Sequence, residues 1–139
     1  MDLPTDYPMT LRLFEIGQFH QFCTMEAHPS VLVVVRNERG CFGKKGASAM
    51  VDEVGDAVGQ LCKTHAVERS SVVLILDTRL SKPNHDPDFE RTAGSKYAAL
   101  TASVCDAVVL TKTRVGLLHI NRVSRPKGRE YTMVADSPC

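Results

Sequence analysis

The chain lacks the long apolar run that a membrane-spanning helix requires. No hydrophobic stretch in its 139 residues approaches the ~20 residues of a membrane span. Residues 1–10 also have neither the basic nor the apolar region of a signal peptide. We therefore expect a cytoplasmic protein without a membrane span.

An excess of charge of one sign is also absent. The formal net charge is +1, which gives no overall bias toward nucleic acid or an anionic membrane. Basic residues are denser between residues 111 and 130, but Tyr131 is the one aromatic nearby that could stack on a base. The sequence therefore does not favour nucleic acid as a partner.

Signatures of catalysis and of metal binding are missing as well. The five cysteines are widely spaced and contain no CxxC pair, which favours a reducing compartment and no disulfide framework. No nucleophile elbow, paired-acid spacing, metal-ligand set or cofactor fingerprint is present. We predict no catalytic residue, no metal and no cofactor, with an enzyme of unknown class left open.

Two continuous apolar runs are the strongest positive signal. Val31–Val35 and Val72–Leu76 do not alternate with polar residues, which is typical of strands covered on both faces. Helical spacing of apolar residues predicts one helix over about residues 49–64, capped by Ser48, and a second from Asp86 to about Val104. The two strands are expected to be adjacent inner strands, and the two helices can supply the cover that both faces need.

The remaining elements complete one α/β domain over residues 11–139. Residues 1–10, with two prolines, should be extended, and residues 11–27 should form one or two antiparallel strands. Ala107–Leu110 and Tyr131–Val134 are expected to be short strands, while Thr113–Val123 fits either a helix or a strand. Strand–helix–strand units make the later strands parallel. We therefore predict a mixed, mostly parallel sheet of four to six strands with helices packed on it.

This element order resembles the STAS domain, the family that includes the anti-sigma-factor antagonists. The most specific pieces are Val31–Val35 followed by a glycine turn, and the strand ending at Asp77 followed by a capped helix. The resemblance implies a STAS-like fold and a non-catalytic regulatory module in signalling that binds another protein. Phosphorylated family members carry an Asp-Ser-Ser type motif at the second helix, where this chain has His85, Asp86, Pro87 and Asp88.

A glycine–lysine loop over residues 40–48 is the best candidate for a small ligand. Free backbone N–H groups, a helix N-terminus and two ammonium groups suit a phosphate or a nucleotide, although the spacing is not that of a P-loop. The alternative is a solvated turn. The candidate ligand-binding residues are Gly40, Gly43, Lys44, Lys45, Gly46 and Ser48.

Polar residues after the central strand are candidates for binding a partner protein. They cluster at the carboxyl edge of the expected sheet, where open α/β sheets usually present their functional groups. Turn and capping roles explain several of them equally well. These residues are Asp77, Arg79, Ser81, His85 and Asp86.

The first strands are rich in large apolar side chains, namely Phe14, Ile16, Phe19 and Phe22. A short meander cannot easily hide that much apolar surface, and exposed patches of this kind usually mark an interface. We therefore expect a homodimer formed through the N-terminal strands.

Overall fold

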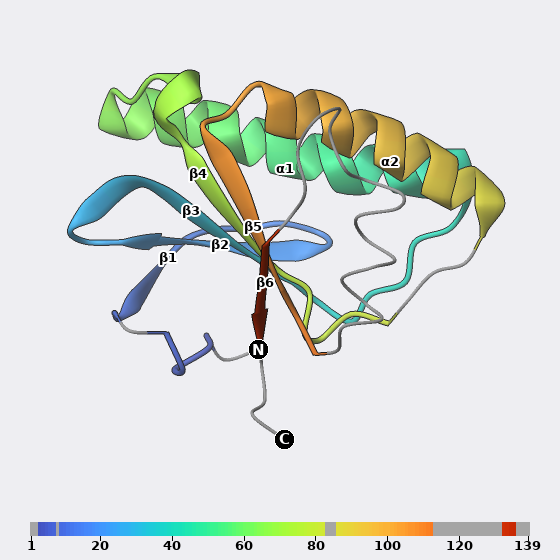
Figure 1. The fold of residues 1–139 in the computed structure, drawn as a ribbon, viewed down its shortest axis with the longest axis horizontal. Coiled ribbons are helices and arrows are strands. Elements are labelled where there is room, and N and C mark those ends of the chain that lie inside the picture. Colours follow the sequence, from blue (N-terminus) through green and yellow to red (C-terminus); the bar gives the residue numbers. More distant parts are fainter. Residues whose placement is uncertain (1–2, 8, 83–85, 113–131, 136–139) are drawn as a thin grey trace.

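A computed structural model describes residues 3–7, 9–82, 86–112 and 132–135 of the chain. These residues form an α/β fold with a mixed sheet of six strands in the order β1-β2-β3-β4-β5-β6. Both long helices lie together on one side of that sheet (Figure 1). The expected segment Thr113–Val123 and the candidate residue His85 lie outside the described residues.

The first three strands form an antiparallel meander. β1 (Leu11–Ile16) pairs with β2 (His20–Met25), and β2 pairs with β3 (His28–Arg36). The register of β1 shifts between Leu13 and Glu15, so Phe14 is an extra residue in that strand. The predicted antiparallel strands over residues 11–27 are therefore confirmed as β1 and β2.

The central strands are parallel, as the strand–helix–strand order predicts. β3 pairs with β4 (Val73–Asp77), β4 with β5 (Asp106–Thr111), and β5 with β6 (Thr132–Ala135). Val31↔Val73 through Val35↔Asp77 are in register, so the two apolar runs are adjacent inner strands. Leu32, Val33, Val34 and Val35 are all almost fully buried, which confirms that the run is covered on both faces.

The two helices cover the same face of the sheet, contrary to the expectation that they would share the two faces. α1 (Gly43–His65) and the short 3₁₀ turn η1 (Arg69–Ser71) connect β3 to β4, and α2 (Pro87–Ala102) connects β4 to β5. Because β3, β4 and β5 follow one another in a single direction, right-handed crossovers place both helices on one side. The main core lies between these helices and Leu32, Val34, Leu74, Leu76 and Val109.

The helix-free face has a smaller core that the N-terminal segment covers. Cys23, Val33 and Val35 point to this side, where Leu3, Tyr7 and Met9 pack against them. The segment predicted to be extended does lack helix and strand over residues 3–7 and 9–10. It nevertheless supplies part of the cover that the sequence interpretation assigned to a helix.

The first helix begins six residues earlier than the predicted start at Ala49. Its N-cap is Phe42, not Ser48, and the first helical residue, Gly43, has a φ of 66° that glycine accepts readily. A Cβ on Gly46 would lie 3.2 Å from the backbone carbonyl carbon of Cys41, so this turn packs closely on the preceding chain. The glycines that indicated a loop instead allow a compact first turn.

The second helix begins as predicted. Asp86 is its N-cap and accepts a hydrogen bond from the Asp88 N–H, and Pro87 occupies the first helical position. The helix ends at Ala102, two residues before the expected end.

Candidate functional site at the carboxyl edge of the sheet

Asp77, the last residue of β4, is the centre of a polar cluster. Its side chain is buried, and both of its carboxylate oxygens accept hydrogen bonds. Arg79 donates from Nε to Oδ1 at 2.9 Å and from Nη2 to Oδ2 at 2.7 Å. Tyr7 donates its phenol hydrogen to Oδ2 at 2.9 Å across a separation of 70 residues. The buried carboxylate is thus compensated by a guanidinium and a phenol.

Arg79 also binds the N-terminal segment. Its Nη1 and Nη2 atoms pair with the two oxygens of the Asp6 carboxylate, the second contact measuring 3.1 Å. The guanidinium carbon lies 5.8 Å from the centroid of the Tyr7 ring. A forked contact of this kind is specific to arginine, because lysine has no planar pair of donors. The predicted partner-binding residues Asp77 and Arg79 therefore bind the chain's own N-terminal segment.

The protonation of Asp6 and Tyr7 follows from these contacts. The hydrogen bond from Arg79 lowers the pKa of Asp6, so its carboxylate stays ionised in mildly acidic solution. Burial raises the pKa of Tyr7, and the negative charge of Asp77 raises it further. The phenol therefore remains a neutral donor over the physiological range.

The other predicted partner-binding residues have local structural roles. Ser81 closes a turn, since its N–H and hydroxyl both donate to the Thr78 carbonyl, at 3.1 and 2.9 Å. Asp86 links two helix starts, because it accepts from the Asp88 N–H at 3.0 Å and from the Gly43 N–H at 2.9 Å. The prediction that these residues bind a partner stays a prediction.

Most residues of the glycine–lysine stretch lie in the first turns of α1. Lys44 and Lys45 are exposed there, as an anion site would need. The Gly43 N–H, however, already donates to the Asp86 carboxylate. A phosphate at this helix start would therefore have to displace Asp86 or bind beside its negative charge.

Arg36 organises the chain between β3 and α1. It donates to the Phe19 carbonyl at 3.2 Å, to the Asn37 carbonyl at 3.0 Å and to the Arg39 carbonyl at 2.8 Å. Its guanidinium also contacts the sulfur of Cys41 at 3.4 Å. Cys41 is buried, and burial raises the pKa of its thiol. The arginine holds this loop in a fixed shape.

The same loop presents a large aromatic side chain to solvent. Phe42 is 76% exposed, although it occupies the N-cap of α1. Leu80, in the loop after β4, is 40% exposed. Both loops follow the carboxyl ends of parallel strands, so these apolar side chains belong to the same edge of the sheet as Asp77.

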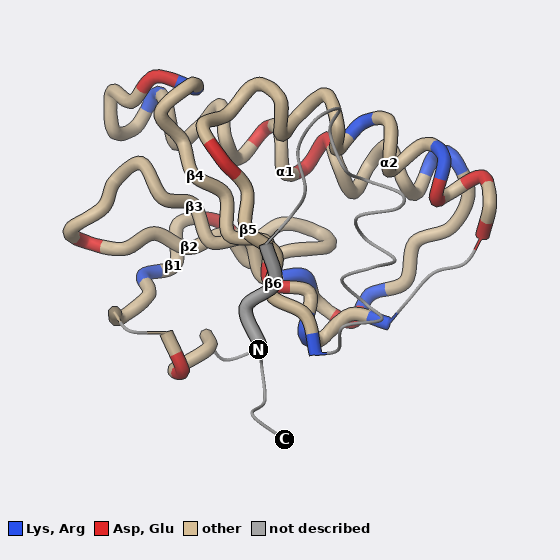
Figure 2. The backbone as a smooth tube through the Cα atoms, viewed as in Figure 1, with Lys and Arg blue, Asp and Glu red and all other residues tan. Residues whose placement is uncertain are grey.

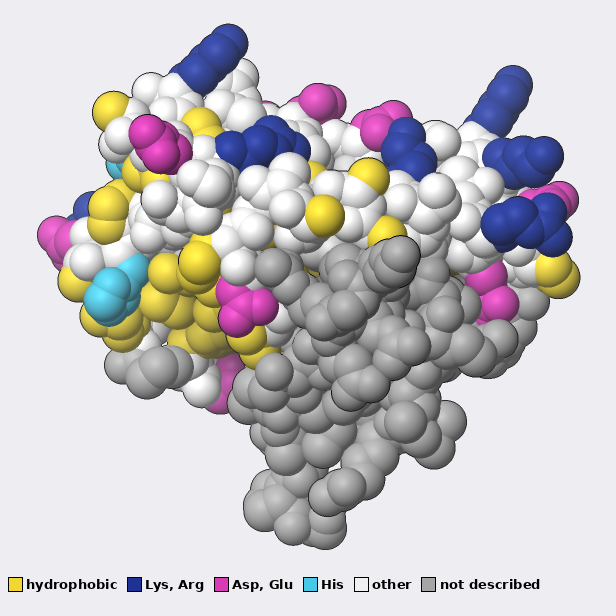
Figure 3. All heavy atoms as spheres, turned by 45° about the horizontal axis from the view of Figure 1, so that its top comes forward, with side chains coloured by type: hydrophobic (Ala, Val, Ile, Leu, Met, Phe, Trp, Pro, Cys, Tyr) yellow, Lys and Arg dark blue, Asp and Glu magenta, His cyan; other side chains and the backbone are white. Residues whose placement is uncertain are grey.

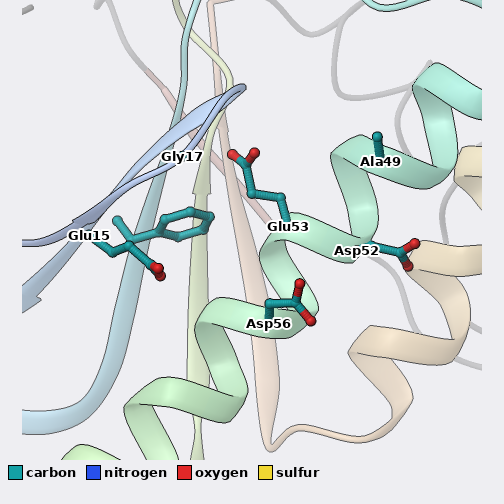
Figure 4. Close-up of a pocket in the computed structure, with 7 residues that line it drawn as sticks. Glu15, Gly17, Ala49, Asp52, Glu53 and Asp56 are labelled. Carbon is teal, nitrogen blue, oxygen red and sulfur yellow. The ribbon is translucent and has the colours of Figure 1, made fainter.

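A shallow acidic cavity of about 270 Å³ lies elsewhere, between the β1–β2 hairpin and α1 (Figure 4). Two of its four carboxylates have partners. Glu53 accepts from the Gln18 and Phe19 N–H groups at 2.7 and 2.9 Å, and Asp52 pairs with Lys96 at 2.5 Å. The residues that line the cavity are Glu15, Gly17, Phe22, Ala49, Asp52, Glu53 and Asp56.

Glu53 also holds the buried imidazole of His20, with Nδ1 and Oε1 2.9 Å apart. Burial lowers the pKa of His20, so the ring is neutral at pH 7 and donates from Nδ1. Burial alone would raise the pKa of Glu53, but hydrogen bonds from His20, Phe19 and Gln18 outweigh it and lower the pKa. The pair fixes the hairpin to α1, and His20 is too buried to act on a substrate.

Sequence reasoning missed Tyr7, Asp6, Phe42 and the His20–Glu53 pair. An Asp-Tyr dipeptide between two prolines was the available signal for the first two.

Within the described residues, no three His, Cys, Asp or Glu side chains converge as metal ligands. No helix in that part of the chain is both long enough and apolar enough to cross a bilayer. No protein-family model, curated protein or solved structure matches the chain.

Proposed function

We propose that the chain is a non-catalytic regulatory module of STAS-like type that binds another protein at the carboxyl edge of its parallel strands. The observation that carries this proposal is the exposed Phe42 at the start of α1. Ser, Thr, Asp and Asn are the residues that stabilise an N-cap, and Phe42 makes no side-chain cap hydrogen bond. Neither capping nor burial explains an aromatic residue here, and such local conflicts are expected at functional sites.

Charge at this edge supports an acidic partner. Figure 2 shows Lys and Arg concentrated on the loops at the lower right, where β3, β4 and β5 end. Electrostatic complementarity speeds the encounter with an oppositely charged surface, while aromatic side chains supply most of the binding energy. The basic residues at the ends of these strands and in the segments that follow them are Arg36, Arg39, Arg79, Lys82 and Lys112, of which Arg79 is paired with Asp77 and Asp6.

The helical side of the molecule also exposes basic side chains, away from the proposed surface. Figure 3 shows Lys and Arg projecting from the helices, while hydrophobic side chains gather at the left of the view. The exposed lysine Lys63, near the C-terminal end of α1, lies far along the helix from Phe42 and Lys44. It therefore provides a matched control for substitutions at the proposed surface.

The test is affinity capture from the native host with wild type, Phe42→Ser and Lys63→Ala as baits, each crosslinked and quantified by mass spectrometry. Proteins that bind this edge should be retained by wild type and Lys63→Ala and reduced at least about tenfold on Phe42→Ser, since an aromatic anchor contributes roughly 2 kcal/mol or more. Identical sets of proteins on all three baits would contradict the proposal.

The exposed pair Lys44 and Lys45 favours one alternative, a phosphate or nucleotide ligand at the start of α1. Each charge-assisted contact is worth roughly 1.5–3 kcal/mol, so replacing both lysines by Ala should weaken such a ligand by about one to four decades. Calorimetry with inorganic phosphate and a nucleotide panel at low salt measures this. No heat from any of them with the wild-type protein would exclude the alternative.

A further inference from the structure

The N-terminal segment lies at the carboxyl edge of β4 as an external peptide would. We call residues 3–7 and 9 the N-terminal strap. Leu3, Tyr7 and Met9 pack on the helix-free face, while Asp6 and Tyr7 bind Arg79 and Asp77. In Figure 1 the strap lies below the sheet, on the side opposite to α1 and α2.

Side chains rather than the backbone attach the strap. Among the described residues, no backbone–backbone hydrogen bond outside helices and strands involves residues 3–7 or 9–10. Tyr7 is half-buried, and the Asp6 side chain is 57% exposed. Opening the strap therefore breaks a small number of side-chain contacts and leaves the pairing of the six strands intact.

The receiving groups are more deeply buried than Asp6 of the strap. Asp77 is 2% exposed and belongs to β4, and the Arg79 side chain is 13% exposed and is held by two hydrogen bonds from its own Nε and Nη2 to Asp77. The Thr78 N–H and hydroxyl donate to the Leu110 carbonyl, which anchors this turn to β5. A fixed guanidinium beside a buried carboxylate is thus ready to receive a carboxylate and a phenol.

We propose that this edge is a recognition site for an extended segment of a partner protein in which an acidic residue directly precedes a tyrosine, and that the strap occupies the site in cis as a competitor. This inference rests on the proposed function, because it names the partner's chemistry at that edge. The Arg79 fork selects the carboxylate, and the Asp77 carboxylate selects a phenol over a phenyl ring. Apolar residues on either side would replace Leu3 and Met9 on the helix-free face.

Competition in cis has a measurable consequence. A tethered segment has an effective concentration on the order of 1 mM. To displace the strap, a partner must therefore be present at a higher concentration than that or bind the site more tightly than the strap does. Weakening the strap should therefore raise the affinity for a peptide in trans without altering the site. Asp6→Lys does this, because it places a cation against Arg79 and changes an exposed side chain.

The probe is a fluorescein-labelled peptide with the sequence of residues 3–10, LPTDYPMT, measured by fluorescence anisotropy against the full chain. Asp6→Lys should bind it at least about tenfold more tightly than wild type does. Asp56→Lys is the matched control, since it makes the same substitution at an exposed side chain of α1, on the side of the sheet opposite to the strap. This control should bind like the wild type.

Peptide variants test the recognition chemistry without any effect on protein folding. Replacing the peptide's tyrosine by Phe, or its aspartate by Asn, should weaken binding to Asp6→Lys about tenfold each. Arg79→Lys in the Asp6→Lys background should weaken the original peptide to a similar extent, because lysine cannot form the fork. Circular dichroism confirms that each protein is folded.

Three results would overturn the inference: no binding of the peptide to Asp6→Lys at about 1 mM, equal binding to Asp6→Lys and Asp56→Lys, or indifference to the Phe and Asn peptides. The proposed function fails separately, since its capture assay depends on Phe42 and not on the strap. Phe42-dependent capture without peptide binding would refute only the present inference. Peptide binding without Phe42-dependent capture would refute only the surface proposed above.

Discussion

At the scale of single residues, Tyr7 joins the N-terminal strap to the end of β4. Its hydroxyl donates to a buried carboxylate that Arg79 already compensates. Tyr7 contributes a directional donor, while its ring covers Val33 and Val35 with Leu3 and Met9. The residue therefore combines an apolar and a polar role, as partly buried tyrosines commonly do.

Tyr7→Phe removes the donor and keeps the ring. Hydrogen bonds to charged groups contribute about 1.5–3 kcal/mol, and we expect the free energy of unfolding to fall by an amount in that range, measured by urea denaturation. In an Asp77→Asn background the same substitution should cost less, because the acceptor is no longer charged. An equal loss in both backgrounds would show that Tyr7 does not act through Asp77.

Gly17 and Gly59 are glycines with opposite surroundings. A Cβ on Gly17 would lie 2.2 Å from Oε1 of Glu53, whose oxygens are held by three donors, whereas a Cβ on Gly59 meets nothing within 4 Å. Gly17→Ala should therefore destabilise the protein by about 1–3 kcal/mol. Gly59→Ala, inside α1, should stabilise it by about 0.5–1 kcal/mol. Thermal melts of the two variants check both signs, and a stable Gly17→Ala would mean that Glu53 can move without loss.

At the scale of elements, Asp86 couples the starts of the two helices. One carboxylate oxygen caps α2 through the Asp88 N–H, and the other accepts the Gly43 N–H at the start of α1. Both helix starts thus present a backbone N–H group to this carboxylate, at the helix end where negative charge is stabilising. The two crossover helices therefore share a single anchor.

Asp86→Ala should cost more than an ordinary N-cap substitution, about 2 kcal/mol, because two helix starts lose an acceptor. Asp88→Ala in the same turn is the control. Among the described residues, its exposed carboxylate makes one ion pair, at 3.7 Å with Arg91, so the loss should stay within about 0.5 kcal/mol. Urea denaturation of both variants measures the difference, and similar losses would contradict the shared anchor.

The homodimer prediction depends on how much apolar surface the edge strand β1 exposes. Phe19 and Phe22 are in the main core and Phe14 packs against it, so most of the aromatic surface that motivated the prediction is not exposed. Leu13 and Ile16 remain 48% and 66% exposed. They pair across the ladder with Cys23 and Gln21, which places both on the helix-free face.

If the chain dimerises through β1, light scattering at tens of micromolar should give twice the monomer mass of 15.3 kDa. Ile16→Lys should then restore the monomer, because a charge on an edge strand opposes strand pairing. A monomer mass for the wild type at that concentration would refute dimerisation.

At the scale of the whole molecule, the His20–Glu53 pair makes stability depend on pH. Folding lowers the pKa of both groups. Below about pH 6.5 the unfolded state therefore binds more protons than the folded state does, and the free energy of unfolding decreases as the pH decreases. The His20 contribution is lost as the pH falls below about 6.5, and that of Glu53 at lower pH, below about 4.5.

We therefore expect the melting temperature to fall between about pH 7.5 and pH 5, with His20→Gln giving a flatter profile in that interval. Glutamine can still donate to Glu53 but does not titrate. Differential scanning calorimetry across this range provides the measurement. Parallel profiles for wild type and His20→Gln would show that another group governs the dependence.

The sequence determined the α/β class, the parallel central strands and the start of α2. Val31–Val35 and Val72–Leu76 could be recognised because a continuous apolar run needs cover on both faces whatever surrounds it. The Asp86–Pro87 start was equally predictable, since capping depends on neighbours within one turn. Such features are local, and local chemistry can be read along the chain.

Only the tertiary structure decided which groups meet. The strand order placed both helices on one face, which left the other to Leu3, Tyr7 and Met9. It also brought Asp6 and Tyr7 to Arg79 and Asp77 across about half of the chain. No periodicity connects residues so far apart, because their contact depends on the sheet that lies between them. The strap and its receiving edge are therefore properties of the fold as a whole.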